Sequence, residues 1–212
     1  MITIKTFVFN SFQENTYVLS DETNSCIIID PGMNSDDEEK EITEYISTNA
    51  LIPEALINTH CHVDHILGCN RIKKLYNIPF SAHESETIII DGAKSFAEFF
   101  GMSIEQPPQP DKNISEKDKI NFGNSQLEIF HIPGHSPGSL IFHCKNDKFA
   151  ITGDVLFRGS IGRTDLPGGD YGLLIEGIKS KLLSLPRETK IYPGHGPGST
   201  IGHEYDTNPF LL

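Results

Sequence analysis

Basic residues are scarce in this chain of 212 residues, in which 17 lysines and arginines stand against 29 aspartates and glutamates. The formal net charge is therefore −12. Because a protein that binds nucleic-acid phosphates needs a basic surface, this balance argues against a nucleic-acid partner. The chain also lacks a run of 18 apolar residues, so we expect no transmembrane helix and no membrane partner.

Two further absences concern the compartment. The N-terminal segment 1–7 alternates like a strand and lacks a signal-peptide pattern, which favours a cytoplasmic protein. No C-x-x-C spacing links the four cysteines, so reduced thiols are expected rather than disulfides: Cys26, Cys61, Cys69 and Cys144. We expect Cys61 to be a packing residue, although it lies between two candidate metal ligands.

One segment is rich in metal-ligating groups. Thr59-His60-Cys61-His62-Val63-Asp64-His65 places three imidazoles and a carboxylate within six positions. Neutral imidazole and carboxylate are good ligands for zinc, iron and manganese. A solvated polar loop is the alternative interpretation, but other segments of the chain supply further ligands of the same types.

Those further ligands follow short apolar runs. Ala55–Ile57 precedes His60, Leu127–Ile132 precedes Pro133-Gly134-His135, Phe149–Thr152 precedes Gly153-Asp154, and Lys190–Tyr192 precedes Pro193-Gly194-His195. Each run is rich in β-branched or aromatic residues and ends at a turn former, which predicts a buried strand. If the strand ends lie side by side, their loops deliver all the ligands to one edge of the sheets, where enzymes of this kind keep their sites.

The remaining pattern alternates strands and helices. In the first half we predict strands at 2–9, 14–19, 25–29 and 55–58, with helices at about 36–49 and 66–76. Residues 84–110 are less regular and contain helical pieces. The second half predicts strands from about 118 to 153, a helix at about 171–184 and a last strand at 189–192. No repeat or low-complexity linker interrupts the chain, so one mixed α/β domain spanning 1–212 is expected.

The motifs resemble those of the metallo-β-lactamase superfamily of metal-dependent hydrolases. The resemblance covers most of the chain, from Ile29-Asp30-Pro31-Gly32 through the T-H-C-H-V-D-H, P-G-H, T-G-D and P-G-H blocks. The segments 153–165 and 192–200 and the tail 207–210 are similar to the short, single-domain glyoxalase II-like branch (hydroxyacylglutathione hydrolase-like). The resemblance implies an αββα sandwich, in which two mixed β-sheets are flanked by helices. It also implies that the C-terminal helical extension that grips glutathione in full-length glyoxalase II is missing.

The resemblance further implies a site for two divalent metal ions, most simply zinc, with iron or manganese as alternatives. Seven side chains correspond to its ligands: His60, His62 and His135 for the first ion, Asp64, His65 and His195 for the second, and Asp154 as the bridge. Two such ions lie about 3.5–4 Å apart and lower the pKa of a shared water to near 7. The resulting metal-bridged hydroxide is the expected nucleophile, and Asp64 is expected to act in catalysis by orienting it.

The function implied is hydrolysis of a small acyl-thiol molecule, a thioester of the hydroxyacylglutathione type. Arg163 corresponds to a basic residue that contacts the acidic thiol part of the substrate, with a structural salt bridge as its alternative role. One alternative function is that of persulfide dioxygenases, which share the fold and use one iron held by residues matching His60, His135 and Asp154. A lactonase-type hydrolase and a metal-binding module without catalysis are further alternatives. The P-G-H block at 193–195 favours the two-metal hydrolase.

Other residues receive ordinary structural interpretations. Asp30 is expected either to hold a ligand imidazole in place or to form a plain turn. An aromatic helix face packed inward is expected at three phenylalanines, with a substrate-pocket wall as the alternative: Phe96, Phe99 and Phe100. Four histidines outside the motifs are expected to lie at the surface or to make supporting hydrogen bonds: His83, His131, His143 and His203.

Overall fold

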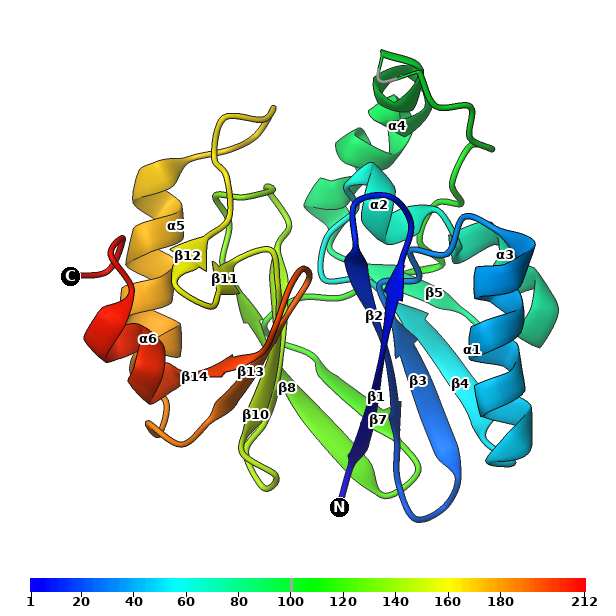
Figure 1. Ribbon diagram of the computed structural model, residues 1–212, viewed down its shortest axis with the longest axis horizontal. Coiled ribbons are helices and arrows are strands. Elements are labelled where there is room, and N and C mark those ends of the chain that lie inside the picture. Colours follow the sequence, from blue (N-terminus) through cyan, green and yellow to red (C-terminus); the bar gives the residue numbers. More distant parts are fainter. Residues whose placement is uncertain (100) are drawn as a thin grey trace.

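Two six-stranded sheets lie face to face in the computed structural model, which describes residues 1–99 and 101–212 (Figure 1). The first sheet has the spatial order β1 (Thr3–Phe9), β2 (Glu14–Ser20), β3 (Ser25–Ile29), β4 (Ile52–Ile57), β5 (Phe80–Ala82) and β6 (Lys112–Asn113). Its first three strands are antiparallel, whereas β3 to β6 pair in parallel. The sheet is therefore mixed, as expected.

The second sheet is also mixed. Its order is β14 (Ser199–Thr200), β13 (Lys190–Pro193), β10 (Phe149–Gly153), β9 (Leu140–Cys144), β8 (Ser125–His131) and β7 (Lys119–Phe122). Strands β10 and β13 pair in parallel, and the other neighbours are antiparallel. Two short strands, β11 (Leu156–Phe157) and β12 (Ser160–Ile161), form a separate hairpin.

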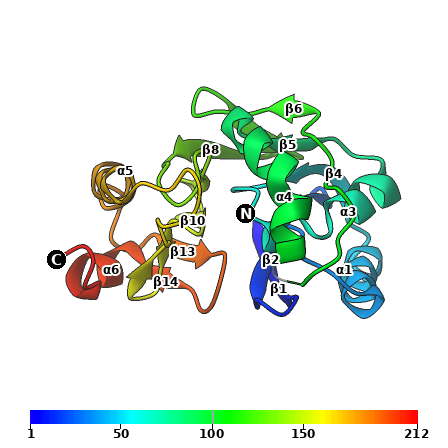
Figure 2. The same ribbon diagram turned by 90° about the horizontal axis from the view of Figure 1, so that it is seen from above.

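Helices cover the outer faces of both sheets, which Figure 2 shows from above. The first sheet is covered by α1 (Asp36–Thr48) and α3 (Cys69–Tyr76), and the second by α5 (Tyr171–Gly177), its π-helical continuation η2 (Ile178–Leu182) and α6 (Ile201–Thr207). The predicted αββα sandwich is thus confirmed. Within the described ranges, no helix is long and apolar enough to cross a membrane.

The buried apolar side chains form three clusters, one between the sheets and one between each sheet and its helices. This explains why the sequences of the strands are continuous apolar runs. Ile27 and Ile29 of β3 lie in the cluster between the sheets, whereas Ile28 lies in the cluster under α1 and α3. On β9, Phe142 faces the other sheet and Ile141 faces α5. Strands buried on both faces lose the alternation of polar and apolar residues.

The helix predicted at 66–76 is two helices in the structure. It begins earlier, as α2 (Val63–Ile66), and is interrupted at Leu67–Gly68 before α3. The Gly68 backbone N–H donates to the Pro31 carbonyl oxygen at 2.7 Å, and a Cβ at Gly68 would lie 1.9 Å from the Met33 sulfur. The close approach of another loop therefore breaks the helix.

The stretch 84–110 is more regular than predicted. It contains η1 (Glu84–Glu86) and the 13-residue helix α4 (Thr87–Phe99). Ile90, Ala93 and Ala97 form the buried face of α4. In contrast, Phe96 is 37% exposed and Phe99 is 85% exposed. The prediction that Phe96 and Phe99 pack inward is therefore wrong, and the third phenylalanine of that prediction, Phe100, lies outside the described residues.

Candidate metal centre

The loops after β4, β8, β10 and β13 meet at one edge of the sandwich, near α2 in Figure 1. His60, His62 and His135 offer ligand atoms within 4.8 Å of one another, and Asp64, His65 and His195 form a second such group. Asp154 lies between the groups, with its Oδ2 atom 3.5 Å from His135 Nε2 and 3.6 Å from His195 Nε2. The predicted convergence of the four strand ends is confirmed.

Glycine is required at two of these strand ends. At Gly194 a Cβ would lie 2.1 Å from Asp154 Oδ1 and 2.7 Å from His65 Cε1, so backbone passes directly beside two candidate ligands. Gly153 has a φ of +47°, and a Cβ there would lie 2.4 Å from Thr59 Oγ1. The glycine before each ligand is thus explained by close backbone approach and by the left-handed turn.

The unpaired polar atoms of this cluster fit bound cations. His65 Nε2 and Asp154 Oδ1 lie 3.5 Å apart, and both are buried without a hydrogen-bond partner among the described residues. His135 Nε2 lies 2.9 Å from His62 Nδ1 and 3.3 Å from His60 Nε2, so three imidazole nitrogens point at one place. Leaving such atoms buried and unpaired is costly. Imidazole nitrogen and carboxylate oxygen donors suit zinc, iron or manganese.

The protonation states of His60, His62 and Asp154 also suit metal binding, which requires neutral imidazoles and ionised carboxylates. Burial lowers the pKa of His60 well below its usual range, and burial together with the neighbouring His135 lowers the pKa of His62 to about 3. Burial alone would raise the pKa of Asp154, but the positive charge that His65 carries lowers it below the usual range. At His65, burial alone would lower the pKa, but the negative charges of Asp64 and Asp154 raise it above its usual range. The negative side of the cluster thus attracts positive charge.

A buried carboxylate behind the cluster holds two of the histidines. Asp30 Oδ2 lies 3.2 Å from His65 Nδ1 and accepts a hydrogen bond from Thr59 Oγ1 at 2.6 Å. Asp30 Oδ1 accepts from the Thr59 backbone N–H at 2.7 Å, and Thr59 Oγ1 lies 3.2 Å from His60 Nδ1. Both imidazoles therefore turn Nε2 toward the centre. Asp30 also has a φ of +50°, so the two interpretations offered by its sequence context, imidazole partner and turn residue, both hold.

Backbone carbonyls orient two more histidines. His135 Nδ1 lies 2.9 Å from the Arg163 carbonyl oxygen, and His195 Nδ1 lies 3.0 Å from that of Phe12. In each case the contact at Nδ1 leaves Nε2 facing the cluster. An imidazole that donates its other N–H to a fixed acceptor is held in one tautomer and one orientation.

Glu86 is a supporting residue that sequence analysis missed. Its buried carboxylate accepts hydrogen bonds from the backbone N–H groups of Cys61 and Gly138, each at 2.7 Å, and from the Ser136 hydroxyl. Cys61 lies between two candidate ligands and Ser136 follows a third. Glu86 therefore ties the ligand loop after β4 to the ligand loop after β8. No motif marks it in the sequence, because its partners lie 25 to 52 residues away.

A pocket of about 250 Å3 opens onto the cluster and is lined in part by Phe12, Phe96, Arg163 and Leu166. The Arg163 guanidinium donates to Asp165 through Nε and Nη2, both at 2.7 Å. Arg163 thus forms the alternative salt bridge and also lines the pocket. Phe96 lines the pocket as well, which agrees with the alternative interpretation of that residue.

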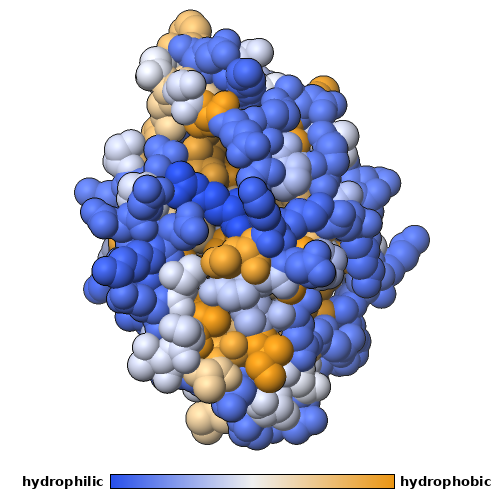
Figure 3. Space-filling view, turned by 90° about the vertical axis from the view of Figure 1, so that its right-hand side faces the viewer, coloured by the Kyte–Doolittle hydropathy of each residue, from blue (hydrophilic) through white to orange (hydrophobic). Residues whose placement is uncertain are grey.

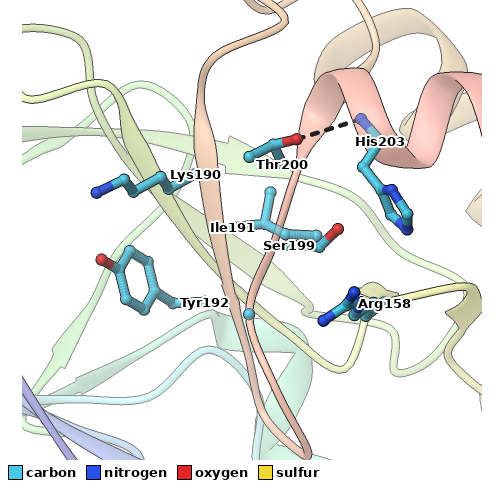
Figure 4. A pocket seen from close by; sticks show the side chains of 8 residues that line it. Arg158, Lys190, Ile191, Tyr192, Ser199, Thr200 and His203 are labelled. Atoms are coloured by element: carbon cyan, nitrogen blue, oxygen red, sulfur yellow. Dashed lines mark hydrogen bonds between the residues drawn. The ribbon is translucent and has the colours of Figure 1, made fainter.

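The four remaining histidines lie outside the cluster, as predicted. His83 and His131 stack with ring centroids 4.2 Å apart, and His143 Nδ1 lies 3.2 Å from Glu128 Oε2. His203 lines a separate hollow of about 400 Å3 beside β13 and β14, together with Arg158 and Tyr192 (Figure 4). None of the predicted metal ligands lines that hollow.

Comparison with known proteins agrees with this geometry. A family model described as "Metallo-beta-lactamase superfamily" matches residues 10–195. The "Probable metallo-hydrolase YqgX" of Bacillus subtilis is 38% identical over 200 residues, covering 94% of this chain and 92% of that protein. "Hydroxyacylglutathione hydrolase GloC" of Haemophilus influenzae is 36% identical over 203 residues, covering 95% and 94%. A solved structure, "TTHA1623 in a di-iron-bound form", is 37% identical with a TM-score of 0.87, covering 98% and 100%.

Proposed function

Because the chain belongs to the metallo-β-lactamase superfamily, we propose that it is a dinuclear metallohydrolase that cleaves thioesters of the hydroxyacylglutathione type. The observation that carries this proposal is the second group of ligand atoms, formed by Asp64, His65 and His195. A mononuclear iron dioxygenase needs only a set of two histidines and one carboxylate. The relative named as a hydroxyacylglutathione hydrolase and the di-iron form of a relative's structure support the same choice.

In this proposal the two groups of residues that meet at Asp154 hold two divalent ions, with zinc as the first choice. When bound, such ions supply a hydroxide nucleophile at neutral pH and polarise the acyl carbonyl. The chain's own contribution is orientation. Asp30 and the carbonyls of Phe12 and Arg163 fix the imidazoles from behind. Asp64 lines the pocket and lies 3.1 Å from His195 Nε2, so its carboxylate is placed to orient the nucleophile and accept its proton.

Metal removal tests the proposal directly. We expect natively loaded protein to contain about two divalent ions per chain and to hydrolyse S-lactoylglutathione. Dialysis against a chelator should abolish turnover, and added zinc should restore it, because the nucleophile depends on the ions. Metal analysis and an assay of the released thiol provide the measurement. If the protein contained a single iron and consumed oxygen when given a persulfide, it would be a dioxygenase and not a hydrolase. Hydrolysis that persists in the presence of a chelator would refute the metal mechanism.

The substrate in this proposal is a small acyl-thiol molecule, with Arg163 contacting its acidic thiol part. We expect Arg163→Ala to raise KM for a glutathione thioester about three- to tenfold and to leave kcat within about twofold, since an exposed charge contributes modestly to binding. Arg158→Ala is the matched control, because this arginine lines the hollow in Figure 4 and not the metal pocket. An unchanged KM in Arg163→Ala would show that the Arg163 side chain makes only its salt bridge to Asp165 and does not contact the substrate.

A further inference from the structure

A second, apolar pocket adjoins the pocket of the metal centre. It lies between α4 and the loop that contains Leu166 and Pro167, and its volume is about 130 Å3. The two pockets share four lining residues: His62, Val63, Phe96 and Leu166. A group bound beside the metal ligands can therefore extend into the apolar pocket without crossing the protein surface.

The lining of this pocket is almost entirely hydrocarbon. Apart from His62, its lining side chains carry no nitrogen or oxygen: Val63, Ile88, Ile89, Ala93, Phe96, Leu166 and Pro167, with Gly92 adding backbone only. Ile88 is 72% exposed, although isoleucine is usually buried. Figure 3, which shows the right-hand side of Figure 1, has apolar side chains in two groups separated by hydrophilic ones, and the upper group lies at the level where Figure 1 places α4. Ile88 lines the pocket, so an apolar occupant would cover part of its exposed side chain.

The volume of the pocket indicates the size of the group that fills it. An engineered apolar cavity of about 150 Å3 in another protein holds a benzene ring. By that measure the 130 Å3 pocket accommodates a chain of about six carbons.

We propose that the preferred substrate carries an aliphatic acyl chain of about six carbons, which lies in this apolar pocket while its thioester carbonyl faces the metal centre. The inference rests on the proposed thioester hydrolysis and specifies the acyl half of the substrate. The pocket selects this half, whereas the thiol half projects from the metal centre toward solvent and Arg163. Glutathione and coenzyme A thioesters share the chemistry that the pocket recognises.

The test measures hydrolysis of thioesters with acyl chains of increasing length, in the wild-type protein and in a variant whose apolar pocket is filled by a larger side chain. The substrates are the acetyl, butanoyl and hexanoyl thioesters of glutathione, S-lactoylglutathione and hexanoyl-coenzyme A. Gly92→Leu fills the pocket, because a Cβ at Gly92 meets no atom within 4 Å and Gly92 lines the pocket. Gly92→Ala is the matched control, since it gives a similar gain in helix propensity without filling the space. Thermal unfolding of both variants confirms that each is folded.

We expect kcat/KM to rise about tenfold or more from acetyl to hexanoyl thioester, because each methylene in an apolar pocket favours the longer substrate. Gly92→Leu should lower kcat/KM for the hexanoyl substrate about tenfold and leave the acetyl substrate within about twofold, whereas Gly92→Ala should change neither. The ratio of kcat/KM for the hexanoyl thioester of glutathione to that for hexanoyl-coenzyme A identifies the preferred thiol half of the substrate.

Two failures can be told apart. Chelator-sensitive hydrolysis that is equal or slower on hexanoyl than on acetyl and lactoyl thioesters would overturn the acyl assignment alone. A hexanoyl preference that survives Gly92→Leu would overturn the placement in this pocket. If no thioester is hydrolysed in a chelator-sensitive way, the proposed function and this inference both fail.

Discussion

Replacing Asp154 by asparagine is expected to reduce thioester hydrolysis about a thousandfold or more, because this carboxylate faces both groups of candidate metal ligands. Its two oxygens lie 3.5 Å from His65 Nε2 and from His135 Nε2. A neutral amide keeps the shape but removes the negative charge that would offset the repulsion between the two cations of the proposed centre. Electrostatic contributions of metal ions are worth several kcal/mol, and each 1.4 kcal/mol is a factor of ten in rate.

The measurement is kcat/KM together with metal content and thermal unfolding of the same preparation. Asp206→Asn is the matched control, since it removes an aspartate from an exposed ion pair with Arg187 and should leave turnover unchanged. We expect Asp154→Asn to remain folded, with about one ion or less per chain. A variant that keeps two ions and more than a tenth of the wild-type rate would show that Asp154 does not bridge the metals.

The placement of the ligands could be predicted because two local signals agree at each strand end. A β-branched run such as Phe149–Thr152 predicts a buried strand, and Gly153 predicts the turn that presents Asp154. The structure has β10 ending at Gly153 in a left-handed conformation. Both signals are local in sequence, so they do not depend on contacts with distant parts of the chain.

Features that depend on distant contacts could not be predicted in the same way. The break before α3 results from the loop at Pro31 approaching Gly68, and nothing near Gly68 in the sequence indicates this. Glu86 lies in a charged segment that resembles a solvated surface, yet its carboxylate is buried under two ligand loops. The exposure of Phe96 likewise follows from how α4 sits over the metal pocket. Tertiary packing overrides local pattern at these places.

Asp30 gives the second large predicted effect, because it holds imidazoles without occupying a predicted ligand position. In Asp30→Asn, the amide oxygen remains opposite the Thr59 backbone N–H, which needs an acceptor. The amide N–H2 then faces His65 Nδ1, whose proton already points that way when Nε2 is a metal ligand. Two donors oppose each other, so His65 must rotate or move its proton to Nε2, and either change removes a metal-binding lone pair.

We therefore expect Asp30→Asn to lower metal affinity about 10- to 100-fold, with a matching loss of turnover at limiting metal. Competition with a chromophoric chelator measures the affinity, and urea unfolding of the metal-free protein measures stability. Asp21→Asn is the matched control, because Asp21 also accepts hydrogen bonds from a threonine hydroxyl and from backbone N–H groups, at Thr23 and Asn124, but lies outside the centre. Both variants should lose stability of about 1–3 kcal/mol, since each leaves a hydrogen-bonding group unpaired. Only Asp30→Asn should also lose metal, and equal metal affinities in the two variants would reduce Asp30 to a turn residue.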